Sequence, residues 1–350
     1  MGIEGFKELI KNECFVNIPI SSISGQRICI DMANLIFKMR YGAMSKCIEN
    51  TDMLSQEPDV EQINLYCTKL ILDKLYMFLE NNIQVICVFD SEHNPLRSIV
   101  NARRKKIKND SKEKFEIVRE KWLNSSYLER QSLIPEYKKL YLRLINIPFG
   151  YPNYLYDLCK SLGFPAYYPS EFYELKNGKP QTGDAESLCA TLCIAGNDYC
   201  WGAYTNDSDF HVYGGNYAIV DIDGTSLKIR CLYKILEKLK VDFDTFKLVC
   251  IIGGCDYNEK LDGVRASKAY ARLLKAGSLE KLKETYNLEQ LNIPQVLDIF
   301  NASIVSIQVP QINFDYDKFK LNCKETLTEI DYNDYINHIN RLFGLNKLNI

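Results

Sequence analysis

The chain has 350 residues, of which 43 are Lys or Arg and 45 are Asp or Glu. The net charge of −2 excludes a general attraction to nucleic acid, so any such binding would need a local basic patch. Hydrophobic residues at 46% and charged residues at 25% are typical of a globular protein with one large or two smaller α/β domains. No apolar run reaches the roughly 18 residues of a membrane span, and the N-terminus contains Glu4 and Glu8, so we expect neither a membrane segment nor a cleavable signal.

Cysteine and histidine usage narrows the chemistry further. The 13 cysteines are odd in number and lie mostly inside apolar runs, which indicates buried, reduced thiols in an intracellular, reducing compartment. Only three histidines are present, and Cys189 and Cys193 have no second Cys pair at zinc spacing. We therefore expect neither a zinc site nor a His-based catalytic triad.

Four apolar, β-branched segments lead to acidic residues. They are RICIDMANL (27–35) with Asp31, IQVICVFDS (83–91) with Asp90, WGAYTNDSD (201–209) with Asp207 and Asp209, and FKLVCIIGGCDYN (246–258) with Asp256. Short apolar runs separated by helical stretches predict the strands of a mostly parallel sheet with helices on both faces. In such sheets the functional crevice lies at the carboxyl ends of the strands, so the acids should meet at one edge.

The segments between these runs have distinct compositions. Residues 97–143 carry 14 Lys or Arg against six Asp or Glu, a net charge of +8, and predict a helical insertion that stands off the sheet. Residues 151–163 predict a short helix that ends before Pro165, and residues 171–183 predict a loop or a small hairpin. Beyond about residue 260 the pattern is mainly helical.

Asp184 and Glu186 add two acids at a predicted helix start. Taken alone, Asp184 could be a helix N-cap and Glu186 could stabilise the first helical turn. Asp207 and Asp209 could form a turn, and Asp31 and Asp90 could each simply end a strand. Seven carboxylates at one edge would repel one another and raise their pKa values, which divalent cations relieve. The seven are Asp31, Asp90, Asp184, Glu186, Asp207, Asp209 and Asp256.

Oxygen-only ligation selects Mg²⁺, with Mn²⁺ as a substitute, and two ions roughly 4 Å apart could cleave a phosphodiester. In extended backbone, Asp207 and Asp209 would point to the same side, so we expect them to hold cations rather than to form a turn. The basic segment 97–143 would draw phosphates past the acidic site.

These residues resemble the flap-endonuclease/XPG family of structure-specific 5′ nucleases. The matching stretches, in chain order, are MGIEGF, CIDMANLIF, VFDSEHNPLR, GDAESLCATL with WGAYTNDSDF, and VCIIGGCDYNEKLDGVRASKAY, from residue 1 to about 275. The resemblance implies a PIN-like 5′-nuclease α/β fold with a basic helical arch and a C-terminal helix–turn–helix DNA-binding region. It also implies Mg²⁺-dependent 5′ flap endonuclease or 5′–3′ exonuclease activity, by a two-metal mechanism, in DNA replication, repair or recombination.

The resemblance assigns roles to individual residues. The seven acids become the ligands of two metal ions, and Arg97 and Arg104, which would share one helix face, become catalytic residues that reach the scissile phosphate. Phe37 takes the position of an aromatic that stacks on a nucleobase, although a core aromatic on the first helix remains an equal alternative. The implied DNA-binding residues are Gly2, Phe37, Arg97, Arg103, Arg104, Lys105, Gly263, Ser267 and Lys268. The implied partner is branched or nicked double-stranded DNA with a 5′ single-stranded flap.

The chain departs from the family pattern in several places. Asp184 stands where the family has Glu, the loop 171–183 is inserted before it, and an alternative register would use Glu171 and Glu174. GVRASKAY (263–270) lacks a glycine and the proline of the family's hairpin, which puts the monovalent-cation site expected near residues 261–268 in question. The C-terminal FGLNKLNI lacks the peptide that recruits a sliding clamp.

We expect a monomer with one nuclease domain over residues 1–350, acting in the nucleus or at a cytoplasmic site of viral DNA replication. Its sub-regions would be an N-terminal nuclease part (1–90), a basic helical arch (91–150), an internal nuclease part (151–260) and a helical C-terminal region (261–350).

Two other functions are open at this stage. AIVDIDGTS (218–226) resembles the nucleophile motif of haloacid-dehalogenase-type phosphatases, with Asp221 as nucleophile and Asp223 as acid/base. We favour a hairpin turn at Asp223 and Gly224 instead. A non-catalytic DNA-junction binder is the other alternative, but it would need a broken acidic set.

Overall fold

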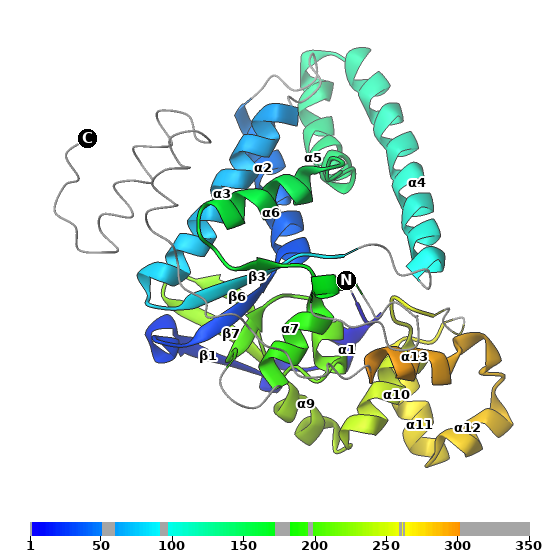
Figure 1. The fold of residues 1–350 in the computed structure, drawn as a ribbon. Coiled ribbons are helices and arrows are strands. Elements are labelled where there is room, and N and C mark those ends of the chain that lie inside the picture. The colour runs from blue at the N-terminus through cyan, green and yellow to red at the C-terminus, as the bar shows by residue number, and fades with distance from the viewer. Residues whose placement is uncertain are drawn as a thin grey trace.

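The computed structural model describes residues 2–50, 60–91, 97–171, 183–194, 199–258, 261 and 263–301 (Figure 1). Its centre is a seven-stranded sheet with the strand order β1-β7-β6-β5-β2-β3-β4. The strands are β1 (Phe15–Pro19), β2 (Arg27–Asp31), β3 (Gln84–Val88), β4 (Ala166–Tyr167), β5 (Gly202–Tyr204), β6 (Tyr217–Asp223) and β7 (Ser226–Cys231). Strands β2 to β6 run parallel, whereas β7 and β1 add an antiparallel edge, so the predicted mostly parallel sheet is confirmed.

Helices make up most of the remaining described residues. The α-helices are α1 (Phe6–Leu9), α2 (Met32–Asn50), α3 (Val60–Glu80), α4 (Ser98–Leu123), α5 (Tyr127–Arg143), α6 (Tyr151–Ser161), α7 (Ala185–Ile194), α8 (Asp209–Val212), α9 (Leu232–Leu239), α10 (Phe243–Gly253), α11 (Ala266–Ala276), α12 (Leu279–Thr285) and α13 (Ile293–Phe300). Short 3₁₀ turns are η1 (Asn12–Cys14), η2 (Ile20–Ile23), η4 (Pro169–Glu171) and η6 (Glu289–Leu291).

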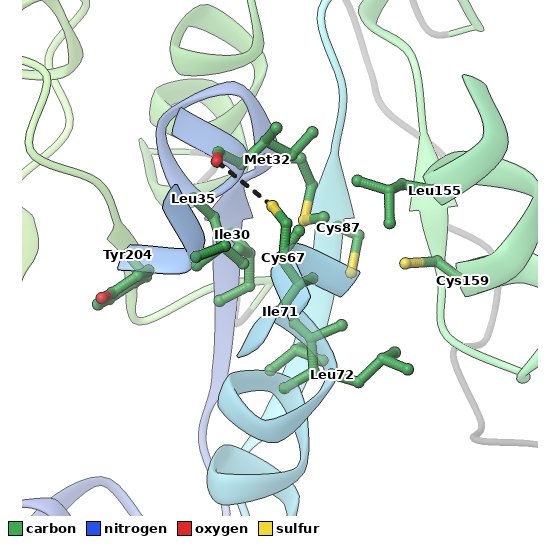
Figure 2. Close-up of a cluster of buried hydrophobic side chains, with 14 of the residues drawn as sticks. Ile30, Met32, Leu35, Cys67, Ile71, Leu72, Cys87, Leu155, Cys159 and Tyr204 are labelled. Atoms are coloured by element: carbon green, nitrogen blue, oxygen red, sulfur yellow. Dashed lines mark hydrogen bonds between the residues drawn. The ribbon is translucent and has the colours of Figure 1, made fainter. Parts of the chain in front are cut away.

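Helices cover both faces of the sheet, as predicted. On β2, Ile28 and Ile30 point into a core formed with α2, α3 and α6, whereas Cys29 between them points into a second core with α7. This alternation follows from the twofold period of extended backbone. Figure 2 shows part of the first core, in which Ile30 lies near Ile71 of α3.

The basic segment forms a pair of helices. α4 and α5 pack against each other, with the rings of Phe115 and Tyr137 4.9 Å apart, and α5 also contacts α2 (Figure 1). A capping box at Ser126 and Glu129 starts α5, which explains the sharp reversal between the two helices. The predicted helical insertion is confirmed, and it contributes buried aromatic side chains to the first core.

One predicted strand is wrong. The apolar run in residues 246–258 forms helix α10, whose N-cap Asp242 accepts a hydrogen bond from the Thr245 N–H at 2.7 Å. Because α10 is buried nearly all round, its sequence lacks the helical period and reads like a buried strand. A Cβ on Gly253 would lie 2.6 Å from Ala266 Cα, so glycine permits the close packing of α10 on α11.

Other local predictions are confirmed. β6 and β7 form the expected hairpin, in which Asp223 faces Ser226 and Gly224 has φ 56°. The helix predicted at 151–163 is α6. Most of the loop predicted at 171–183, with Glu174, lies outside the described residues, as do His93, His338 and the C-terminal FGLNKLNI.

Two findings bear on the environment of the chain. In the part that the structure describes, no helix is both long and apolar enough to cross a membrane. The described cysteines are all free, and all but Cys193 are buried, which agrees with the predicted reduced thiols.

Candidate active site

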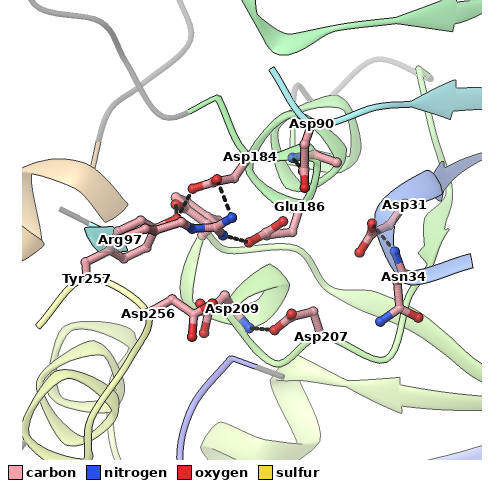
Figure 3. A network of polar contacts seen from close by, with 12 residues as sticks. Asp31, Asn34, Asp90, Arg97, Asp184, Glu186, Asp207, Asp209, Asp256 and Tyr257 are labelled. Atoms are coloured by element: carbon pink, nitrogen blue, oxygen red, sulfur yellow. Dashed lines mark hydrogen bonds and ion pairs between the residues drawn. The ribbon is translucent and has the colours of Figure 1, made fainter. Parts of the chain in front are cut away.

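The seven predicted acids surround one region at the carboxyl edge of the sheet (Figure 3). Asp31 ends β2, Asp90 follows β3, and Asp207 follows β5. The remaining acids come from helix ends: Asp184 and Glu186 from the start of α7, Asp209 from the start of α8, and Asp256 from the turn after α10. Parallel strands and helix termini thus deliver carboxylates from distant parts of the chain to one place.

Asp31 is fixed by two hydrogen bonds. Its Oδ1 accepts from the Asn34 N–H at 3.0 Å, in the first turn of α2, and its Oδ2 accepts from the Thr205 hydroxyl at 2.7 Å. Burial, assisted by the negative charge of Asp90, raises the pKa of Asp31 to about 7.

Asp90, not Asp184, caps helix α7. The Ala185 N–H donates to Asp90 Oδ1 at 2.8 Å, whereas the Asp184 carboxylate turns away from its own helix. Asp184 accepts a short hydrogen bond from the Tyr257 hydroxyl and pairs with Arg97. The N-cap explanation of Asp184 is therefore wrong, and burial raises the pKa of Asp184 to about 6 even though Arg97 opposes this.

Arg97 bridges Asp184 and Glu186. Its Nη1 lies 2.8 Å from Asp184 Oδ1 and its Nη2 lies 2.8 Å from Glu186 Oε1. Its guanidinium also sits over the ring of Tyr257, 5.5 Å from the centroid. Burial raises the pKa of Glu186 well above its ordinary value, and Arg97 only partly offsets this.

Asp207 and Asp209 do not lie on extended backbone as predicted. The chain turns after Thr205, where the Asp207 N–H donates to the Thr205 hydroxyl at 3.0 Å and the Asp209 N–H donates to Asp207 Oδ1 at 3.2 Å. Asp209 is the first residue of α8. The turn-forming tendency of Asp and Ser decides the local conformation, and the turn still directs both carboxylates into the site.

The geometry of Asp209 indicates that the site suits a cation. The side chain is fully buried, and neither of its carboxylate oxygens has a hydrogen-bond partner. Burial and the charges of Asp207 and Asp256 raise the pKa of Asp209 well above its ordinary value. A buried carboxylate without a hydrogen-bond partner costs folding free energy. A hard divalent cation bound to its oxygens would offset that cost.

Side-chain positions differ from those of a complete metal site. Among the described residues, no three Asp, Glu, His or Cys side chains are arranged so that they could hold a metal ion together. Instead, arginines form ion pairs with three of the carboxylates. Arg97 pairs with Asp184 and Glu186, and Arg104 Nη2 lies 2.6 Å from Asp256 Oδ2. The donor set fits Mg²⁺ or Mn²⁺, provided that these guanidinium groups move.

The remaining predicted residues lie around the same region, or on α11 and the turn before it. Arg103 pairs with Glu4, and Lys105 is exposed on α4. Phe37 is 43% exposed on α2, so the interpretation as a core aromatic is wrong. Gly2 has φ 75°, and a Cβ there would lie 2.6 Å from Ser208 Oγ and 2.9 Å from Asp209 Oδ1.

The region predicted as a helix–turn–helix follows Asp256 and contains α11 and α12 among its described residues, and its DNA-binding role stays a prediction. Exposed Gly263 has φ 68°, Ser267 is half-buried in the first turn of α11, and the Lys268 ammonium donates to the Gly263 carbonyl at 2.9 Å. Residues 259, 260 and 262 lie outside the described part, and the monovalent-cation site expected near residues 261–268 stays a prediction.

Three residues of the site were not found from the sequence. Tyr257 is buried and Tyr213 is half-buried, and their hydroxyls share a hydrogen bond of 2.7 Å. The Tyr257 hydroxyl also donates to Asp184. Thr205 holds Asp31. The position of Tyr257 beside Asp256 was the only available signal, and it does not reveal a partner more than seventy residues away.

Proteins similar to this chain are found in sequence and in structure. Residues 181–256, which contain five of the acids, match the family model described as the XPG I-region. Flap endonuclease 1-1 of Paramecium tetraurelia is 26% identical over 298 residues, covering 81% of this chain and 67% of that protein. Flap endonuclease-1 from Methanococcus jannaschii has a TM-score of 0.59 at 18% identity, covering 97% of this chain and 98% of its own. The catalytic core of Rad2 in complex with a DNA substrate has a TM-score of 0.60 at 16% identity, covering 96% and 98%.

The fold is thus that of the 5′ nucleases, with the XPG I-region match falling on the acidic site itself. These similarities support the resemblance to the flap-endonuclease/XPG family that the sequence motifs imply.

Proposed function

We propose that the protein is a structure-specific DNA nuclease that hydrolyses phosphodiester bonds with divalent metal ions, two Mg²⁺ in the active state. The XPG I-region match over the acidic site and the DNA-bound state of the similar Rad2 core support this proposal. The proposed substrate is branched or nicked double-stranded DNA with a 5′ single-stranded flap, and cleavage from a 5′ end would be a second activity of the same site.

The observation that carries the proposal is Asp209, a fully buried carboxylate whose two oxygens have no partner, among six other acids. When bound, Mg²⁺ would polarise the phosphodiester and activate the attacking water. The carboxylates Asp31, Asp90, Asp184, Glu186, Asp207, Asp209 and Asp256 would hold the ions, some directly and some through water.

The start of α4 supplies the positive charge that such a site needs. Arg97, Arg103 and Arg104 all contact acids of the nuclease core, so their guanidinium groups already reach the reaction region. We propose that Arg97 and Arg104 exchange these carboxylates for the scissile phosphate when metal and DNA bind. Phe37, exposed on α2, would stack on an adjacent base.

Labelled flap, nicked, gapped and blunt DNA with Mg²⁺ test the proposal. The intact chain should cleave the flap substrate, and Asp209→Asn should reduce the single-turnover rate by roughly 10² to 10³, the usual effect of removing one electrostatic group from an active site. Asp223→Asn is the matched control, because Asp223 is an exposed acid at the end of β6 and does not lie in the acidic site. It should cleave at the normal rate.

The two alternatives predict different results. A junction binder would hold the flap DNA without cleaving it under any metal condition. A haloacid-dehalogenase-type phosphatase would lose activity with Asp221→Asn as severely as with Asp209→Asn. Asp221 and Asp223 both lie on β6, which forms an antiparallel hairpin with β7, and this position argues against the phosphatase.

A further inference from the structure

A cleft of about 920 Å³ lies beside the carboxylate site. Its walls are the N-terminal segment with α1, one residue of α2, the loop after β5, and the β6–β7 hairpin. Helix α4 contributes none of the lining residues. The volume is near the upper end of the roughly 300–1,000 Å³ that ligand pockets occupy.

Positive charge dominates this lining. Five cationic residues, Lys7, Lys11, Lys38, Lys228 and Arg230, define what we call the basic cleft, against two acids, Glu8 and Asp221.

Both acids of the cleft are already neutralised. Glu8 lies 3.0 Å from Arg265, a residue that does not line the cleft. Asp221 lies 3.2 Å from Lys38, which does line it. Within the described ranges, no carboxylate pairs with Lys7, Lys11 or Lys228. The cleft therefore holds uncompensated positive charge.

Arg230 is the buried member of the set. It is 5% exposed, its Nη2 donates to the Asp207 carbonyl at 2.6 Å, and its Nε is buried without a partner. A buried cation without an ion-pair partner is expensive, and an anionic ligand would stabilise it.

The basic cleft adjoins the proposed reaction centre. Ser208, which stands between Asp207 and Asp209 in the chain, lines the cleft. Its hydroxyl accepts a hydrogen bond from the Ile3 N–H at 2.7 Å. Lys38, another lining residue, directly follows the exposed Phe37. A polyanion in the cleft would therefore pass next to both the carboxylates and the predicted stacking residue.

We propose that the basic cleft binds the sugar–phosphate backbone of the DNA substrate, as a phosphate-binding track separate from α4 and from the helix–turn–helix. The inference takes its ligand from the proposed nuclease function. Lys7, Lys11 and Lys228 contact successive phosphates through exposed, adaptable side chains, and Arg230 supplies a fixed positive charge at the end nearest Asp207. Such contacts add affinity that does not depend on base sequence.

Fluorescence anisotropy with a labelled 5′-flap DNA, in EDTA so that cleavage does not contribute, tests the proposal. Lys7→Ala/Lys11→Ala should weaken binding about tenfold and lower the slope of log Kd against log salt by about two, since each lost phosphate contact removes close to one. Lys228→Ala should lower the slope by about one. The matched control is Lys281→Ala/Lys283→Ala, two exposed lysines of α12 that lie outside the cleft.

Each outcome decides the matter. Loss of affinity and slope in the cleft variants with an unchanged control supports the track. Unchanged binding in the cleft variants overturns it, whether or not the protein cleaves DNA, so this failure is distinct from failure of the nuclease proposal. If inorganic phosphate or a mononucleotide loses binding to the cleft variants while flap DNA does not, the cleft is a small-anion site and the proposal is wrong. Arg230 stays intact throughout, because truncating a buried side chain could unfold the protein.

Discussion

Arg97 forms an ion pair with Asp184, with 2.8 Å between Nη1 and Oδ1, and the same guanidinium binds Glu186. A divalent ion would need the oxygens that Arg97 now occupies. We therefore expect Arg97→Ala to bind Mn²⁺ about tenfold more tightly in the absence of DNA, which is a typical coupling between two competing groups. The same variant should cleave DNA more slowly. Electron paramagnetic resonance of free Mn²⁺ measures this affinity. Arg119→Ala, whose partner Glu116 lies on α4, should leave it unchanged; equal or weaker Mn²⁺ binding by Arg97→Ala would contradict the competition.

Arg104→Ala should slow cleavage far more than it weakens binding. Arg104 reaches Asp256 at 2.6 Å, which places its guanidinium at the reaction centre rather than along the duplex. We expect a loss of about 10² in the single-turnover rate at saturating DNA, with a change in Kd of only a few-fold. Lys105→Ala, an exposed neighbour on α4, should show the opposite pattern. Equal losses of rate and affinity in Arg104→Ala would mean that Arg104 supplies backbone affinity alone.

Gly2→Ala should impair the site although it adds one methyl group. That methyl would lie 2.6 Å from Ser208 Oγ and 2.9 Å from Asp209 Oδ1, and closer still to Asp207 Oδ1. We expect flap cleavage to fall by about 10², since small misplacements of reacting groups are costly. Gly25→Ala is the control for backbone strain, because Gly25 also has positive φ, at 79°, but no atom lies within 4 Å of a Cβ there. Similar losses in both variants would point to strain rather than to crowding of the acids.

Tyr257→Phe should raise the Mg²⁺ concentration that cleavage requires. The hydroxyl of Tyr257 donates to Asp184, and loss of a hydrogen bond to a metal ligand typically costs about 10- to 100-fold in metal affinity. Mn²⁺ titration without DNA gives a readout independent of turnover. Tyr270→Phe is the control, because the Tyr270 hydroxyl donates to the carbonyl of Leu239, the last residue of α9, and to none of the seven acids. An unaltered metal affinity would make the contact merely structural.

Stability without divalent metal should fall as pH rises. The pKa of Asp31 is raised to about 7 and that of Asp184 to about 6, against 3.8 in the unfolded chain, so the folded state retains protons that the unfolded state releases. These two groups therefore favour folding most at low pH, and their contribution declines from about pH 4 to about pH 7. Because Mg²⁺ binds the ionised carboxylates, the increase in Tm on adding Mg²⁺ should be larger at pH 8 than at pH 5.

Thermal unfolding of Asp31→Asn provides the control for this pH dependence. The amide side chain of this variant has no titratable proton to lose, so the decline in Tm between pH 5 and pH 8 in EDTA should become shallower. Asp221→Asn removes an exposed acid outside the cluster and should leave the decline unchanged. A decline that is the same in all three proteins would show that other groups control it.

The acids themselves were predictable because they follow apolar runs whose ends meet in a parallel sheet. β2, β3 and β5 form where their β-branched runs predicted, and Asp31, Asp90 and Asp207 follow them as expected. The run before Asp256 has the same composition but forms α10, since a helix buried all round loses its period and cannot be told from a strand. Asp256 nevertheless reaches the site, because the turn after α10 lies at the same edge.

The sequence by itself determined which carboxylates, arginines and strands could form a nuclease site, through residue type, spacing and order along the chain. Only the tertiary structure decided which groups touch. It places Asp90 against the N-terminus of α7, Arg97 between two acids, and Tyr257 on Asp184. It also brings the lysines of α1 and β7 together in the basic cleft. The physical reason is that these pairs lie far apart in the chain, so packing of the sheet and helices, rather than any local pattern, sets their distances.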